Sequence, residues 1–210
     1  MTIRVVNLGL PKSGTTTLAR ALRRAGLKTA DFRIREGQAT KTAPRGAFVA
    51  DLLYRGYYDT GDPGAFLSGF EAISEMSLSR AGKSLWPQTD FALIRALRRH
   101  HPGLKLLATR RGSFDMSQSM LAWGNLGSER LPALAVPGLP AGFGSTSAER
   151  ELWIDGHYQT LRDMFEHDPA FLEIDVSAPG TPRRIEAHLE LALPWWGAAN
   201  KTASKERPAE

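Results

Sequence analysis

The segment GLPKSGTTTL, residues 9–18, constrains the fold more than any other part of the chain. It follows residues 3–8, a short run rich in β-branched side chains that is typical of a buried strand. It leads into residues 15–25, where leucines and alanines recur at helical spacing until Gly26 ends the pattern. A strand, a glycine-bounded turn and a helix in this order predict an anion-binding loop at the helix N-terminus.

The rest of the chain alternates between short apolar runs and segments with helical spacing. The patterns predict strands at residues 28–32, 70–74, 104–109 and 171–176, and helices at 89–100, 114–123, 148–165 and 183–191. Thr181 and Pro182 are expected to open the last helix as its cap and first turn. We therefore expect a single α/β domain over residues 1–210, a three-layer α/β/α architecture like that of phosphate-loop NTPases, with a mainly parallel sheet of about five strands.

Three segments do not fit this alternation. Residues 55–64 and 124–146 are rich in glycine and proline and are predicted to be loops, and the second is long enough to act as a lid. The polar residues 197–210 are expected to form a frayed tail.

The lysine of the glycine-bounded turn is in an unusual place. In an ATP- or GTP-binding loop, G-x-x-x-x-G-K-[ST], the lysine follows the second glycine and the hydroxyl residue holds Mg²⁺. Here Gly9 and Gly14 have the required separation, but Thr15 occupies the lysine position and Lys12 lies inside the loop. The pattern keeps the anion-binding turn without the residues that grip a triphosphate.

A second anion site is predicted at the end of another strand. Phosphate-loop NTPases place a metal-holding aspartate there, whereas the predicted strand 104–109 is followed by Arg110 and Arg111. A guanidinium binds phosphate through paired hydrogen bonds rather than holding a cation. We therefore expect a ligand with two separate phosphate-like groups and no required metal.

These motifs resemble those of sulfotransferases that use 3′-phosphoadenosine-5′-phosphosulfate (PAPS), including small bacterial members of the family. The turn resembles their 5′-phosphosulfate loop, and Arg111 followed eight residues later by Ser119 resembles the pair that holds the 3′-phosphate. The likeness extends to GFEAISE (69–75), FLEIDV (171–176) and LPWW (193–196), and so covers most of the chain. It implies that PAPS and its product adenosine 3′,5′-bisphosphate are bound by Pro11, Lys12, Ser13, Gly14, Thr15, Thr16, Thr17, Arg111 and Ser119.

The chain departs from the family pattern at three points. The turn after Arg111 lacks the family's Arg-Asp-Pro form, which leaves Arg110 with Gln118 as an alternative pair. Thr17 replaces a tryptophan that contacts adenine in many members, so the residue that stacks on the base is open. The C-terminal Arg-Lys-Gly loop is missing, and Asn200 with Lys201 is at best a weak substitute.

Sulfuryl transfer requires in-line placement and charge stabilisation. The resemblance implies that Lys12 lies beside the oxygen that bridges phosphate and sulfate. Glu75 is the first candidate for the base that takes the acceptor's proton, because it directly follows the predicted strand 70–74. Glu71, within that strand, and His157 are the alternatives, each more readily explained by a structural role. An aromatic acceptor wall could be formed by Tyr54, Tyr57, Tyr58 and Trp86.

Composition excludes several classes of protein. The chain contains no cysteine, which rules out disulfides and thiolate chemistry. No run approaches the roughly 18 apolar residues of a membrane span, and no secretory signal opens the chain, so a cytoplasmic protein is expected. The net charge of +5 would suit nucleic acid, but the basic clusters at 20–24 and 95–99 have the spacing of solvated helix faces. We expect neither a nucleic-acid nor a membrane partner.

The sequence thus predicts a sulfotransferase that moves a sulfuryl group from PAPS to a hydroxyl or amine of a small molecule or glycan. One alternative is a phosphate-loop kinase for a small metabolite. Another is a non-catalytic nucleotide-binding module that has kept the fold.

Overall fold

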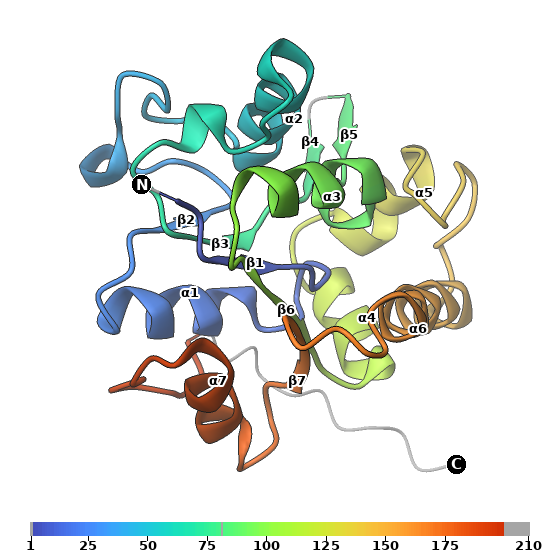
Figure 1. The fold of residues 1–210 in the computed structure, drawn as a ribbon. Coiled ribbons are helices and arrows are strands. Elements are labelled where there is room, and N and C mark those ends of the chain that lie inside the picture. Colours follow the sequence, from blue (N-terminus) through green and yellow to red (C-terminus); the bar gives the residue numbers. More distant parts are fainter. Residues whose placement is uncertain (1, 81, 200–210) are drawn as a thin grey trace.

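The computed structural model describes residues 2–80 and 82–199, and its centre is a parallel five-stranded sheet (Figure 1). The strand order is β2-β3-β1-β6-β7, which confirms the predicted α/β architecture and parallel sheet. The strands are β1 (Val5–Asn7), β2 (Thr29–Asp31), β3 (Ala72–Glu75), β6 (Lys105–Arg110) and β7 (Phe171–Asp175). The helices are α1 (Thr15–Arg24), α2 (Val49–Thr60), α3 (Phe91–His100), α4 (Ser113–Leu121), α5 (Leu131–Ala133), α6 (Ser147–Met164) and α7 (Thr181–Leu189).

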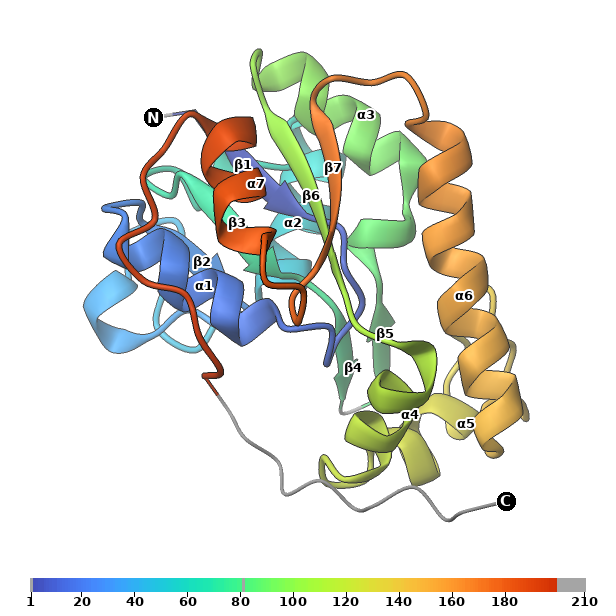
Figure 2. The same ribbon diagram turned by 90° about the horizontal axis from the view of Figure 1, so that it is seen from below.

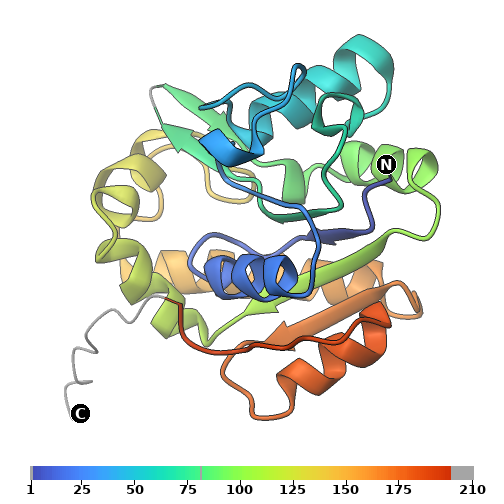
Figure 3. The ribbon, with the colours of Figure 1, turned by 90° about the vertical axis from the view of Figure 1, so that its left-hand side faces the viewer.

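Side chains along each strand alternate between two apolar cores. Val6 and Leu106 belong to the core formed with α2, α3 and α6, whereas Val5 and Leu107 belong to the core formed with α1 and α7. Successive side chains of a strand point to opposite faces, and because both faces are covered, neighbouring positions such as Val5 and Val6 are both apolar. Figures 1 and 3 show α2 and α3 on one side of the sheet and α7 on the other.

The loop prediction for residues 55–64 is wrong over its first part, because residues 55–60 complete α2. The glycine within this segment does not make a turn. A Cβ on Gly56 would lie 2.6 Å from the carbonyl oxygen of Asp62, so a glycine is required where the returning chain packs closely on the helix. The helix ends at Gly61, which adopts a left-handed conformation with φ of 78°.

Several boundaries and short elements also differ from the prediction. Residues 124–146 are not a plain loop, since they contain a five-residue π-helical turn, η4 (Leu126–Arg130), and α5. An antiparallel hairpin of β4 (Leu78–Arg80) and β5 (Lys83–Leu85) was not predicted. Helix α3 begins at Phe91 with Asp90 as its cap, and Thr181 is the first residue of α7 rather than its cap. The remaining short helices are η1 (Glu36–Gln38), η2 (Ala65–Leu67) and η3 (Pro87–Thr89).

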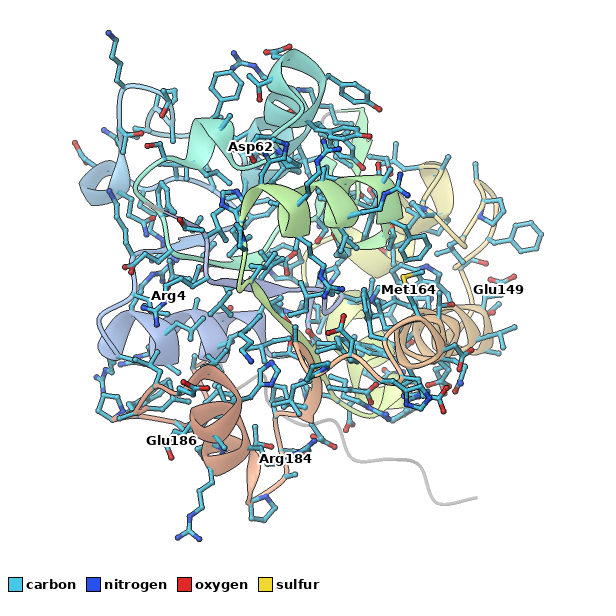
Figure 4. All side chains as sticks on the ribbon, viewed as in Figure 1. Arg4, Asp62, Glu149, Met164, Arg184 and Glu186 are labelled. Carbon is cyan, nitrogen blue, oxygen red and sulfur yellow. The ribbon has the colours of Figure 1, made fainter. Side chains whose placement is uncertain are left out.

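The two ends of the sheet differ in how they are closed. At the amino ends of the strands, the His101 ring accepts a hydrogen bond from the Ile3 amide and lies 3.2 Å from Asp62. Figure 4 labels Asp62. At the carboxyl ends, β1 stands between β3 and β6, where the strand order reverses. Figure 2 shows α4, the β4–β5 hairpin and the segment after α7 gathered at this end. Ligand sites of open parallel sheets lie at such a reversal.

Candidate active site

A cleft of about 1520 Å³ opens at the carboxyl ends of the strands. The loop after β1 forms part of its wall, as do the ends of β2 and β3 and the beginning of α4. Every site residue predicted from the sequence lines it except Ser13, which is fully buried. Those that line it are Pro11, Lys12, Gly14, Thr15, Thr16, Thr17, Glu75, Arg111 and Ser119.

The loop after β1 has the backbone of an anion-binding turn. The Ser13 amide donates to the Leu10 carbonyl at 3.3 Å, closing a turn in which Lys12 has a positive φ of 71°. This conformation is unusual for a residue with a side chain and marks stored strain. Gly14 also has a positive φ, 105°. Turns that contain such residues can direct several backbone N–H groups toward one position, as in phosphate-binding nests.

Two glycines let the loop pack closely against neighbouring segments. A Cβ on Gly9 would lie 2.5 Å from both the carbonyl and the hydroxyl oxygen of Thr109, and a Cβ on Gly14 would lie 2.7 Å from the Val176 side chain. The first contact would force the backbone of β6 to move, and the second would displace the Val176 side chain after β7. The loop is therefore held between the ends of these two strands.

A buried hydrogen-bond network supports the loop from behind. The Asn7 side-chain amide donates to the Ser74 carbonyl at 2.9 Å and to the Thr109 hydroxyl at 3.0 Å, and its oxygen accepts from the Thr109 amide at 2.9 Å. The Ser13 hydroxyl lies 2.7 Å from the Thr109 hydroxyl. The Tyr158 hydroxyl donates to the Thr109 carbonyl at 2.6 Å and accepts from the Leu10 amide. The Ser13 hydroxyl is engaged here and its amide closes the turn to Leu10, so both polar groups of Ser13 make contacts within the loop and its support.

The first turn of α1 presents uncapped N–H groups to the cleft. The residue before the helix is Gly14, which provides no side-chain cap, and the first turn contains no acidic residue. Such N–H groups lack partners within the helix, and the helix dipole adds partial positive charge. This helix end is suited to an anion.

Lys12 extends from the loop into the cleft. Its ammonium group lies 5.0 Å from the centroid of the Trp123 ring. Burial and the nearby Arg111 lower the pKa of Lys12, while the negative charge of Glu75 acts in the opposite direction. Lys12 thus lies within electrostatic reach of both the second anion site and the candidate base.

The structure distinguishes the two arginines after β6. Arg110 is bound to Glu173 at 2.8 Å, which raises its pKa, and it does not line the cleft. Arg111 does line the cleft, and among the described residues it has neither a hydrogen-bond nor an ion-pair partner. Gln118 and Ser119 both line the cleft, but only Arg111 is available to pair with them.

Glu75 is the last residue of β3, not the first residue after it, so the predicted strand end is one residue short. Its side chain is 7% exposed, and this burial raises the pKa to about 7. Hydrogen bonds from Ser77 and Thr15 partly oppose the shift. The amide of Ser77 donates to Glu75 at 2.9 Å, and so does its hydroxyl. A carboxyl group with this pKa can accept and release a proton near neutral pH.

The two alternative bases lie elsewhere. Glu71 precedes β3 at the opposite end of the sheet, where it accepts from the Lys28 amide at 3.2 Å and pairs with Arg4 at 3.7 Å. His157 lies 2.9 Å from the Leu8 carbonyl, and burial lowers its pKa to about 4. The neutral ring therefore donates from Nε2 to that carbonyl. Neither side chain lines the cleft.

Aromatic side chains line the cleft at positions that the sequence did not indicate. Trp86 was predicted and does line it, whereas the three tyrosines of α2 do not. The aromatic residues that line the cleft without having been predicted are Phe32, Phe114, Trp123 and Trp196. Helical spacing around Phe114 and Trp123 gave the same signal as a core-facing pattern, so only the structure identifies them as cleft residues.

The segment after α7 closes the cleft beside α1. Gly197, Ala198 and Ala199 line the cleft, and the Ala199 amide donates to the Thr17 hydroxyl at 3.4 Å. These three residues of the predicted tail are thus in contact with the loop region. Asn200 and Lys201 lie outside the described residues.

No family model and no curated protein sequence matches this chain. Among solved structures, one titled as an unliganded sugar kinase from a Janibacter species is similar, with a TM-score of 0.47 and 19% identity. The match covers 91% of this chain and 96% of that one. Its title corresponds to the kinase alternative rather than to the sulfotransferase prediction, but similarity at this level supports neither. No helix of the described residues is long and apolar enough to cross a membrane.

Proposed function

We propose that this protein is a sulfotransferase that moves a sulfuryl group from PAPS to a hydroxyl or amine of a small molecule or glycan. One observation carries the proposal. Lys12, displaced into the loop, and Arg111, which has no partner among the described residues, line the same cleft at the ends of adjacent strands. Two cationic sites in one cleft suit a ligand with two separate anionic groups.

The residues at the loop fit the 5′-phosphosulfate end of PAPS. The uncapped turn of α1 and the positive-φ residues Lys12 and Gly14 present N–H donors. A side chain at Gly9 would displace the Thr109 backbone, and one at Gly14 would displace the Val176 side chain. Arg111 and Ser119 would hold the 3′-phosphate.

The adenine side of the ligand would lie toward the segment after α7. Thr17 replaces the expected tryptophan, but Trp196 lines the same cleft, close in sequence to the Ala199 amide that contacts Thr17. An indole offers a flat face for a base, with stacking worth about 1–3 kcal/mol. Trp196 is therefore our candidate for the missing stacking residue.

When bound, PAPS supplies the sulfuryl group that is transferred. Lys12 would stabilise the negative charge that grows on the leaving phosphate oxygen. Glu75 would take the proton from the acceptor hydroxyl, and its pKa of about 7 lets it do so near neutral pH. Ser77 holds the Glu75 carboxylate in place through its amide and hydroxyl.

The kinase alternative shares the loop but not its chemistry. It would require a lysine where Thr15 stands and a metal-holding carboxylate where Arg111 follows β6. A non-catalytic module would share the ligand but would not need Glu75 in the cleft.

Thermal stabilisation by nucleotides separates these readings, because a ligand that binds the native state raises its stability. Adenosine 3′,5′-bisphosphate in EDTA is expected to raise the melting temperature, while ATP–Mg²⁺ and an oligonucleotide at the same concentration are not. A larger shift with ATP–Mg²⁺ would favour the kinase. Bisphosphate binding combined with unchanged turnover of Glu75→Gln would leave the ligand assignment intact and refute the proposed base.

A further inference from the structure

The side of the cleft away from the phosphate loop contains four arginines: Arg33, Arg35, Arg45 and Arg130. Two of them are neutralised, Arg35 by Asp31 at 3.2 Å and Arg45 by Glu36 at 3.2 Å. The described part of the chain offers no ion pair to the other two. This side of the cleft therefore has more positive charge than its carboxylates balance.

Of the two unpaired arginines, Arg33 has a structural role. Its Nε donates to the Gly46 carbonyl at 3.1 Å, and its guanidinium group lies 5.8 Å from the centroid of the Phe48 ring. These contacts tie the segment after β2 to the residues before α2. Arg130, at the end of η4, makes similar contacts but differs in that its Nε is buried without a hydrogen-bond partner.

Arg130 and Ser79 contain buried polar atoms without partners. One terminal nitrogen of Arg130 donates to the Ser79 carbonyl at 2.7 Å, but its Nε has no partner and is shielded from water. Ser79 is 6% exposed, and its hydroxyl also lacks a partner. Burial and the neighbouring Arg80 lower the pKa of Arg130. Buried polar groups are almost always satisfied, so unsatisfied donors on two contacting residues that line a cleft point to a ligand. The side chains would turn slightly toward the cleft to reach it.

Arg130 and Lys12 both lie next to the indole ring of Trp123. Lys12 lies 5.0 Å from the centroid of the Trp123 ring, and the Arg130 guanidinium lies 5.4 Å from the same centroid. The cationic groups of Lys12 and Arg130 thus lie at most about 10 Å apart. A small molecule can reach both positions at once.

We propose that Arg130 and Ser79 bind an oxyanion of the acceptor, a carboxylate, sulfate or phosphate group, while the acceptor's hydroxyl or amine lies near Glu75. The guanidinium supplies directed N–H donors, and the Ser79 hydroxyl supplies one more. A neutral analogue would leave these donors unpaired, so the site would select acidic acceptors. The assignment of this anion to an acceptor rests on the proposed function, whereas the anion site itself does not.

Inorganic sulfate is a suitable probe for this site, because adenosine 3′,5′-bisphosphate can first saturate the donor side. The indole N–H resonance of Trp123, assigned with Trp123→Phe, is followed by NMR during a sulfate titration at constant ionic strength. We expect a saturable shift in the wild type. Arg130→Gln should weaken sulfate binding roughly 10–100-fold, the range for a hydrogen bond to a charged group.

Two further variants make the test independent of whether Arg130→Gln folds. Ser79→Ala keeps the carbonyl that accepts from Arg130 and removes only the unpartnered hydroxyl. It should retain or gain thermal stability while weakening sulfate binding several-fold. Arg55→Gln is the matched control, because Arg55 stacks on Phe66 and does not line the cleft. Its sulfate affinity should equal that of the wild type.

The outcomes separate this proposal from the proposed function. Equal sulfate affinity in the wild type and in a folded Arg130→Gln variant overturns the anion site, as does the lack of a saturable shift. If Arg130→Gln does not fold, unchanged affinity in Ser79→Ala overturns it. If bisphosphate fails to bind, the titration is run without it. Sulfate binding that still depends on Arg130 then supports the anion site although the proposed function has failed.

The same proposal can be tested by turnover, by comparing kcat/KM for neutral and acidic acceptors. Glucose and glucuronate differ by a carboxylate, and 4-hydroxybenzamide and 4-hydroxybenzoate form a phenolic pair. Greater kcat/KM for the acidic member, lost in Arg130→Gln, is the expected result. Preference for the neutral member of both pairs would overturn the assignment of the anion to the acceptor.

Discussion

The two halves of the cleft are built in different ways. We call one the donor half, because the proposal places PAPS there; it consists of the loop after β1, the first turn of α1 and Arg111. Apart from the Lys12 and Arg111 side chains, it presents mainly backbone N–H groups, and Asn7 and Thr109 support the loop from behind. The acceptor half consists of side chains from β4, η4 and the segment after β2, and its central contact is Arg130 with Ser79. The first half depends on backbone shape, the second on which side chains are present.

This difference affects how each half can change. Substitution of Gly9 would force a Cβ against Thr109, so the donor half tolerates little variation. The acceptor half is built from side chains that line the cleft, so we expect more of them to be replaceable. One scaffold can therefore keep a donor while its acceptor varies, as sites placed on a common fold often do.

Glu75 is proposed to act between the two halves, and Glu75→Gln should have the largest effect of these variants on turnover. It should lower turnover roughly 10²–10⁴-fold, the usual range for a general base, and leave bisphosphate affinity unchanged. The wild-type kcat/KM should rise with pH through about 7, since the ionised carboxylate is the base, and the variant should lack this rise. Glu71→Gln, at the other end of β3, is the matched control. Near wild-type turnover of Glu75→Gln would contradict the assignment.

The same variant should reveal a stability cost of the site. The folded protein raises the pKa of Glu75 from 4.5 to about 7, so its favourable contribution is complete below pH 4.5 and is lost as the pH rises through 7. Relative to the wild type, Glu75→Gln should thus gain up to about 3 kcal/mol between pH 4.5 and pH 8. Urea unfolding at both pH values measures this difference. An equal difference at both values would show that the carboxyl group is not strained by burial.

His157 affects stability in the opposite direction with pH, because its pKa is lowered whereas that of Glu75 is raised. Burial lowers its pKa from 6.5 to about 4, so its contribution to stability is complete above pH 6.5 and is lost as the pH falls toward 4. The free energy of unfolding of Glu75→Gln must therefore be compared with that of the wild type at each pH. The pH dependence of the wild type alone contains both effects.

Arg111→Ala examines the donor half alone. It should weaken adenosine 3′,5′-bisphosphate by roughly 1.5–3 kcal/mol and leave 5′-AMP nearly unaffected, because Arg111 would contact only the 3′-phosphate. Titration calorimetry with both ligands measures the difference. Arg110→Ala is the control, since Arg110 binds Glu173 and Glu173 keeps Arg162 as a second partner. If Arg110→Ala, and not Arg111→Ala, selectively weakened bisphosphate binding, the 3′-phosphate site would have to be assigned to Arg110.

The donor half could be predicted from the sequence because its parts are close along the chain. Strand, loop and helix follow one another within residues 3–25, and the apolar periods that define them are short-range signals. Arg111 was found because it follows an apolar strand in a parallel sheet, whose carboxyl ends meet at one edge.

The acceptor half could not be predicted for physical reasons. Strands β4 and β5 have three residues each and no alternating apolar pattern, so nothing in LSR or KSL indicates a hairpin. Arg130 meets Ser79 across 51 residues of sequence, and η4 lies in a segment whose glycines and prolines indicate a loop. Residues 55–60 were misassigned for a related reason, since Gly56 serves tertiary packing rather than a turn.

Thr146→Ala should have the smallest effect and tests whether the halves are independent. Thr146 caps α6, where its hydroxyl accepts from the Glu149 amide at 3.2 Å and Glu149 bonds back to the Thr146 amide at 3.1 Å. Loss of the cap should cost about 1 kcal/mol of stability, or roughly 2–4 °C in Tm for a chain of this size. Thr146→Ser, which retains the cap, is the control. Thr146 lies at the end of the segment that connects η4 to α6. Loss of the cap should loosen this segment, so sulfate binding at Arg130 should weaken slightly. Tyr158, which supports the phosphate loop, lies about three turns further along α6, so bisphosphate affinity should not change. A parallel loss of bisphosphate affinity would show that α6 couples the two halves.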